Sequence, residues 1–123
     1  MENKVENKKR YDLEDRSRAF ARDIRVFVKL LPKNQANFED SKQLVRSSGS
    51  VGANYIEANE SLSKKDFLMR VRIARKEAKE SKYWLELLDT NEIKETETSR
   101  RKLLQEATEL MMILSAIMRK SEV

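Results

Sequence analysis

The chain has 123 residues, of which 38% are charged and 39% hydrophobic, and it carries a formal net charge of +5. It contains no cysteine and no histidine, which excludes disulfides, thiolate chemistry and the side chain that most often serves as general base or metal ligand. No segment approaches the roughly 20 apolar residues needed to span a bilayer, and the first residues lack the apolar core of a signal peptide. We therefore expect a single cytoplasmic domain with no membrane, metal or cofactor.

The N-terminal segment differs from the rest of the chain. Residues 1–11 are charged and poor in apolar side chains, which predicts a flexible tail ahead of a folded domain at residues 12–120. Apolar side chains at steps of three and four begin after Asp12, and this spacing predicts a first helix that Pro32 ends.

Three further amphipathic segments follow. The second helix is expected to begin near Asn37, its predicted N-cap, and its apolar stripe continues to Leu62. Ser63 with Asp66 resembles a capping box at the start of the third and most regular helix, and a polar connection then leads to the fourth. Four such helices with short connections predict an all-α domain, an antiparallel up-down four-helix bundle.

Both glycines of the chain lie inside the second helix. Gly49 and Gly52 fall on one face, which predicts that another helix backbone approaches closely there and that a larger side chain at either position overpacks the contact. Ser48, on the core stripe, is interpreted as a small spacer. The Gly-X-X-Gly spacing also occurs in KH-type RNA-binding loops, but that fold needs strands, which are not evident in this sequence.

The third helix carries a second apolar face that includes its tryptophan. One helix cannot direct both faces into one core, so this face predicts a contact between subunits. Two carboxylates on it would set the register of that contact, unless they are merely solvated. The predicted interface consists of Met69, Ile73, Glu77, Glu80, Trp84 and Leu87.

Basic side chains are concentrated on two helices. Residues 64–82 hold eight basic and three acidic groups, so they carry the whole net charge of the chain. A charged face is often only solvated, but such stripes also attract nucleic-acid phosphates. The candidate phosphate contacts are Arg18, Arg22, Arg25 and Lys29 on the first helix and Arg72, Arg75, Lys76, Lys79 and Lys82 on the third.

Catalytic patterns are weak. A di-iron four-helix bundle expects Glu-x-x-His pairs, and the chain has no histidine. The serines near the glycines have no evident base in the sequence. We therefore expect a protein that is not an enzyme.

Three segments carry a family resemblance: RSSGSVGANYIEA at 46–58, SKKDF at 63–67 and IARKEAKESKYWLELL at 73–88. Together they resemble the four-helix bundle proteins of the 23S rRNA intervening-sequence family, and the similarity extends from about residue 12 to residue 117. Many relatives carry proline where this chain has Gly52, which implies a less kinked second helix here.

The resemblance implies a left-handed antiparallel bundle that assembles into a homopentamer and has no established enzymatic activity. A related branch, the accessory variability determinants of diversity-generating retroelements, forms basic pentameric barrels that bind nucleic acid and a reverse transcriptase. Within the family motif the resemblance implies polar pairing and packing rather than catalysis. With the small residues of the second helix, this defines a predicted packing set of Ser48, Gly49, Gly52, Asn54 and Glu57.

These observations favour a non-enzymatic homo-oligomer that binds RNA or DNA through its basic helix faces. The alternative is an adaptor or scaffold that recognises a protein, such as a reverse transcriptase, and has no nucleic-acid role.

Overall fold

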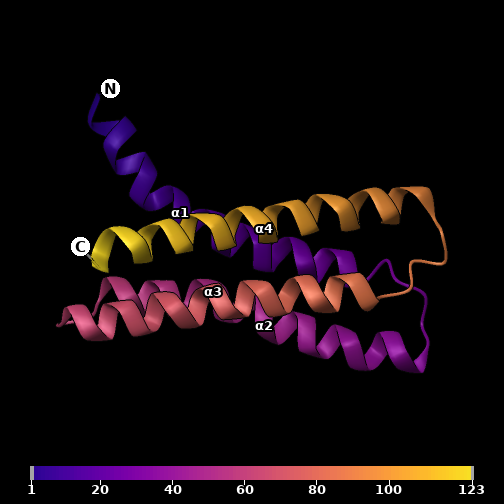
Figure 1. Cartoon of the computed structure of the whole chain (residues 1–123). Helices are drawn as coiled ribbons and strands as arrows, with labels where there is room; N and C mark the ends of the chain where they lie inside the picture. Colours follow the sequence, from indigo (N-terminus) through magenta and orange to yellow (C-terminus); the bar gives the residue numbers. More distant parts are fainter. Residues whose placement is uncertain (1, 123) are drawn as a thin grey trace.

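The computed structural model describes the backbone of residues 2–122 and the side chains of residues 13–122. All regular structure within this part is helical, and Figure 1 shows the helices running alongside one another. The helices are α1 (Glu2–Val28), α2 (Gln35–Asn59), α3 (Lys64–Leu87) and α4 (Lys94–Glu122). The predicted all-α class with four helices is thus confirmed, while the up-down order, the handedness and the assembly stay predictions. No helix in the described part is both long and apolar enough to cross a membrane.

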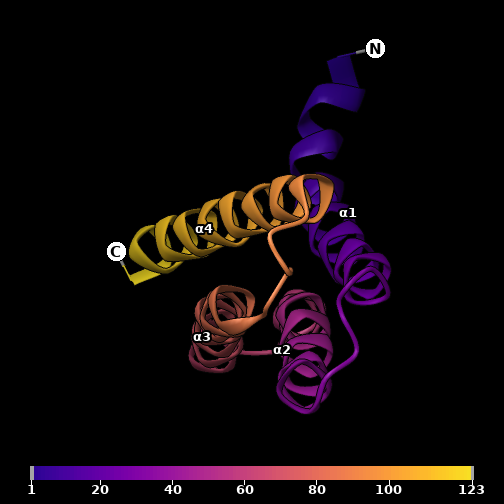
Figure 2. The ribbon, with the colours of Figure 1, turned by 90° about the vertical axis from the view of Figure 1, so that its right-hand side faces the viewer.

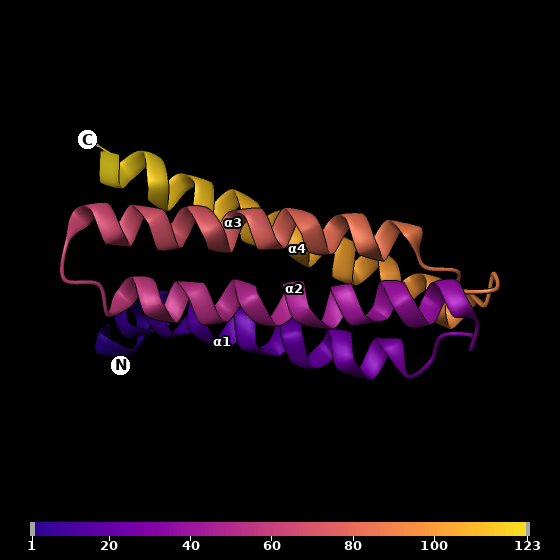
Figure 3. The ribbon, with the colours of Figure 1, turned by 90° about the horizontal axis from the view of Figure 1, so that it is seen from below.

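The helices form a ring of neighbours. The contact between α2 and α3 is the most extensive, followed by α3 with α4 and α1 with α2, and the contact between α1 and α4 is the smallest. Figure 2 shows the four helices from one end of the bundle, with α1 beside α2 and α3 beside α2, and Figure 3 shows them from below. Within the described residues α1 does not contact α3, so these two helices lie diagonally across the bundle.

The first turns of α1 lie in the segment expected to be a tail. The helix begins at Glu2, and Figure 1 shows its start extending beyond the other helices. Met1 and the side chains of residues 2–12 lie outside the described part, and the flexibility of residues 1–11 stays a prediction.

The core follows the predicted stripes. Large side chains from all four helices are almost completely buried, as helical spacing requires of a face directed at one centre. They include Phe20, Ile24, Phe27, Leu44, Val51, Val71, Leu85, Leu110 and Leu114. One member of the predicted stripe fails: Leu62 lies beyond the end of α2 and is fully exposed, because the chain has already turned towards α3.

The start of α2 differs from its prediction. Asn34, not Asn37, is the N-cap, and its side chain accepts a hydrogen bond from the backbone N–H of Asn37 at 2.8 Å. Asn37 is buried, and its amide donates to the carbonyls of Pro32 and Asp89 and accepts from the N–H of Asp89. The residue predicted to cap a helix therefore joins the α1–α2 connection to the α3–α4 connection.

The start of α3 agrees with its prediction. Ser63 is the N-cap, and its hydroxyl accepts from the N–H of Asp66 at 3.1 Å. Helix α1 ends at Val28, one turn before Pro32, which lies in the connection that follows.

Candidate nucleic-acid interface

The two glycines of α2 have different surroundings. A Cβ atom at Gly52 would lie 2.9 Å from Oγ and 3.2 Å from Cβ of Ser17, so α1 and α2 approach each other too closely there for any side chain. At Gly49 the nearest atom to such a Cβ would be a guanidinium nitrogen of Arg25 at 3.5 Å, an ordinary contact. The expected close approach is therefore found at Gly52 only.

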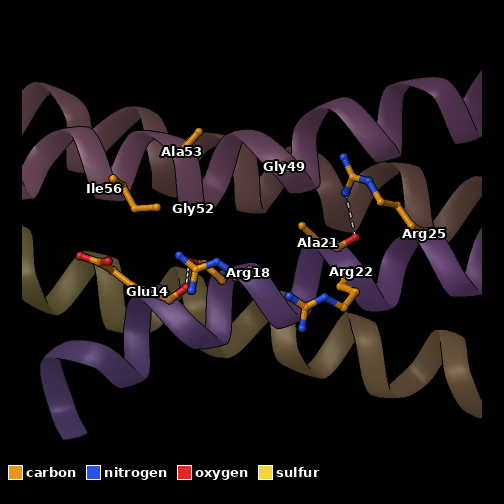
Figure 4. Close-up of a pocket in the computed structure, with 10 residues that line it drawn as sticks. Glu14, Arg18, Ala21, Arg22, Arg25, Gly49, Gly52, Ala53 and Ile56 are labelled. Atoms are coloured by element: carbon orange, nitrogen blue, oxygen red, sulfur yellow. Dashed lines mark hydrogen bonds between the residues drawn. The ribbon is translucent and has the colours of Figure 1, made fainter.

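Beside this contact the surface between α1 and α2 is hollow. The hollow, called here the arginine groove, has a volume of about 400 Å³. Figure 4 shows its three arginines side by side along α1, opposite the glycines of α2. The groove is lined by Glu14, Ser17, Arg18, Ala21, Arg22 and Arg25 of α1 and by Gly49, Gly52, Ala53 and Ile56 of α2.

The arginines of the groove are weakly engaged by the protein. Arg18 forms an exposed ion pair with Asp15 at 2.9 Å, a kind of pair that contributes little to stability. Arg25 donates to the carbonyl of Ala21 at 2.9 Å, and no ion pair of Arg22 is found among the described residues. Their charges are thus available to an anion in the groove.

The basic residues of α3 form a second surface, called here the α3 basic face: Arg72, Arg75, Lys76, Lys79 and Lys82. Arg72 lies 3.7 Å from a carboxylate oxygen of Glu122, on α4. Within the described part no ion pair involves the other four, of which Lys76 and Lys79 are exposed and Arg75 and Lys82 are half-buried.

The two basic surfaces lie on different sides of the bundle. The arginine groove lies between α1 and α2, whereas Arg72 reaches towards α4 from α3. Because α1 and α3 are not neighbours, the nine predicted phosphate contacts do not form one patch on a single chain. Lys29, also exposed, lines a separate hollow at the α1–α2 connection.

The apolar residues of the predicted subunit contact differ in how far they are exposed. Met69 and Leu87 are about half exposed, while Ile73 is half-buried and Trp84 is half-buried and packs partly on the core of its own chain. The ring of Trp84 meets that of Tyr83 edge-on at a centroid distance of 5.0 Å.

The two carboxylates of that predicted contact pair with α2 of their own chain. Arg46 donates to Glu77 at 3.2 Å and to Glu80 at 2.6 Å. Burial raises the pKa of Glu77, whereas the hydrogen bond with Glu77, reinforced by Arg46, lowers the pKa of Glu80. The indole N–H of Trp84 also lowers the pKa of Glu80, as the smallest of these contributions. Trp84 Nε1 is buried and has no partner at normal hydrogen-bond distance and angle among the described residues. Arg46 was not among the residues singled out from the sequence.

The residues of the predicted packing set of α2 differ in burial and in the contacts that they make. Ser48 is completely buried, and Asn54 accepts a hydrogen bond from Arg70 at 3.1 Å, which links α2 to α3. Glu57 is exposed. Ser47 and Ser81 share a buried hydrogen bond of 2.8 Å between the same helices, a pair that helical spacing alone does not predict.

Metal binding has no evident basis in the described side chains. No group of three or more acidic residues among residues 13–122 is placed to hold a metal ion.

Comparison with known proteins identifies the family. The 23S rRNA-intervening sequence protein family matches residues 9–116. No curated protein matches the chain. The chain is similar to a crystal structure of a protein of unknown function from the S23 ribosomal protein family of Bacteroides thetaiotaomicron, with 38% identity over 86% of this chain and 97% of that chain and a TM-score of 0.74. The chain therefore belongs to the 23S rRNA-intervening sequence protein family.

Proposed function

We propose that this protein is a non-enzymatic, cytoplasmic homo-oligomer that binds nucleic acid by its backbone phosphates, with the α3 basic face as the main contact. The observation that carries the proposal is the lack of carboxylate partners for four of the five cations of this face among the described residues. Membership of a family named for a 23S rRNA intervening sequence supports RNA as the ligand.

Phosphate binding of this kind follows from charge and not from base pattern. Lysine and arginine on a helix face displace the counterions condensed on the backbone, so affinity falls steeply as salt rises. Such contacts position a nucleic acid without reading its sequence. We therefore expect tight binding at low salt and no strong sequence preference.

Charge reversal tests this proposal. Replacing Arg72, Arg75 and Lys79 by glutamate is expected to weaken binding of a labelled RNA by about tenfold or more in fluorescence anisotropy at about 50 mM salt. The control makes the same charge change on exposed residues of α4, as Arg101→Glu, Lys102→Glu and Lys120→Glu.

Two results would contradict the proposal. One is RNA affinity that is equal at about 50 and about 500 mM salt, because phosphate contacts are salt-dependent. The other is unchanged binding in the α3 variant, which would favour the adaptor role.

The assembly is part of the same proposal, as a left-handed up-down bundle that forms a pentamer. Its support is a hollow of about 600 Å³ on the outer surface of α3, lined by Ile73, Tyr83 and Trp84 and also by Lys76 and Lys79 of the α3 basic face, with Met69 and Leu87 exposed along the same helix. Because the two proposed contacts share these lysines, loss of RNA binding in the charge-reversal variant supports phosphate contacts when the mass of that variant in light scattering equals that of the wild type. Because Trp84 also packs on the core, Met69→Glu with Leu87→Glu is the cleaner test. This variant is expected to give smaller species in light scattering at micromolar concentration, whereas Met112→Glu on α4, equally apolar and 64% exposed, is expected to leave the mass unchanged. An unchanged mass for the α3 variant would exclude this face as the contact.

A further inference from the structure

An exposed aromatic side chain lies at the α1–α2 connection. Phe38 is 59% exposed and lines a hollow of about 550 Å³ together with Lys29, Pro32 and Lys33. The ammonium of Lys42 lies 4.3 Å from the centroid of its ring. This hollow therefore combines an accessible aromatic ring with several positive charges.

The local fold does not account for this phenylalanine. Phe38 is the fourth residue of α2 after the N-cap Asn34, a position where an apolar side chain often packs on the residue before the cap. That residue is Lys33, so no apolar partner is present. Phe38 is also outside the core. Lys42 lies over one face of the ring, and the exposed remainder of the ring is available to a ligand.

The hollow beside Phe38 and the arginine groove lie along one line of contact between α1 and α2, called here the α1–α2 seam. On α2, residues 38, 41, 45, 49 and 52 follow one another at steps of three and four and so share a face. On α1 the same is true of Arg18, Arg22 and Arg25, and Lys29 follows directly after the last residue of the helix. From Arg18 to its end at Val28 the helix rises roughly 15 Å, a length that matches several successive backbone phosphates.

We propose that the α1–α2 seam binds a single-stranded nucleic acid, with phosphates along Arg18, Arg22, Arg25 and Lys29 and one base stacked on Phe38. The inference rests on the proposed function, because it takes nucleic acid as the ligand. A single strand can offer an unstacked base to an aromatic ring, whereas a duplex keeps its bases inside the helix. Gly49 lines the groove without a side chain and so leaves room for the strand to lie close to α2, whereas Gly52 is covered by Ser17 of α1.

The test compares two probes and two substitutions on the full-length protein. The probes are a fluorescein-labelled oligouridylate of about 12 nucleotides, within the range of single-strand site sizes, and an RNA duplex of equal length. Phe38→Ala is expected to weaken binding of the single strand by about tenfold and to leave the duplex unaffected, because it removes one stacking platform. Phe38→Trp is expected to retain single-strand binding. Met112→Ala, which shortens an apolar side chain of similar exposure on α4, serves as control.

The outcomes separate this inference from the proposed function. Equal binding of the single strand by wild type and Phe38→Ala overturns the inference, and so does an equal loss with both probes. In either case, loss of both probes in the α3 charge-reversal variant would still support the proposed function. If the wild type binds neither probe, the proposed function fails and the inference fails with it.

Discussion

Around its middle, α2 makes a contact with α3 and a contact with α1, and the two contacts differ in character. Towards α3 the surface is closed: Ser47 bonds to Ser81, and Arg46 bridges Glu77 and Glu80. Towards α1 the helices touch at Gly52 and then separate, which leaves the arginine groove open to solvent. Small residues of α2 take part in both contacts, but the arginine on the α3 side is Arg46 of α2 itself, whereas the three arginines of the groove belong to α1.

The comparison shows what distinguishes a structural cation from an available one. Arg46 has two carboxylates opposite it on the neighbouring helix, whereas Arg22 has no ion pair among the described residues. Opposite the groove, α2 presents glycine, alanine and isoleucine instead of carboxylates. A cation is therefore free for a ligand where the packed neighbour carries no acid.

The largest effect is expected at the contact between α1 and α2. Gly52→Leu forces a side chain against Ser17 and should lower the free energy of unfolding by about 1–3 kcal/mol, measured by urea denaturation followed by circular dichroism. Gly49→Leu is the matched control, since its side chain can enter the groove, and should cost at most about 1 kcal/mol. Equal losses for the two variants would mean that the α1–α2 seam is closed along its whole length.

An intermediate effect is expected on the closed face. Ser47→Ala removes the hydrogen bond between Ser47 and Ser81 in a fully buried position, while Ser81 still donates to the carbonyl of Glu77, and should cost about 1 kcal/mol. Ser47→Ala combined with Ser81→Ala should cost less than the sum of the single changes, because each single change already removes the hydrogen bond that the two serines share. Strict additivity in this double-mutant cycle would show that the two serines do not interact.

The smallest effect concerns pH. In the folded protein the pKa of Glu80 lies below its ordinary value of 4.5, so its stabilising contribution is present above that pH and is lost as the pH falls through the folded value. The stability of the wild type should therefore fall more between about pH 5 and about pH 3 than that of Glu80→Gln. The difference should stay below about 1 kcal/mol for such a solvent-accessible pair.

Glu57→Gln, at an exposed position of α2, is the control for the loss of one negative charge. A Glu80→Gln profile identical to that of the wild type would contradict the pairing with Arg46.

The local sequence pattern was sufficient to predict much of the structure of this molecule. The helix content, the buried stripes and the cap at Ser63 all follow from the order of residues, because each depends on neighbours within about four positions. The family resemblance depends on the same local motifs. The basic residues were visible for the same reason, since charge and helical spacing need no knowledge of the fold.

Only the packing of the helices decided which of these residues meet. Because of this packing, Asn37 links the α1–α2 connection to the α3–α4 connection. Glu77 and Glu80 form ion pairs with Arg46 of their own chain. The two basic helix faces lie on different sides of the bundle. Each of these outcomes depends on how one helix is rotated and placed against another. Helical spacing states which residues share a face and contains no information about what that face will touch.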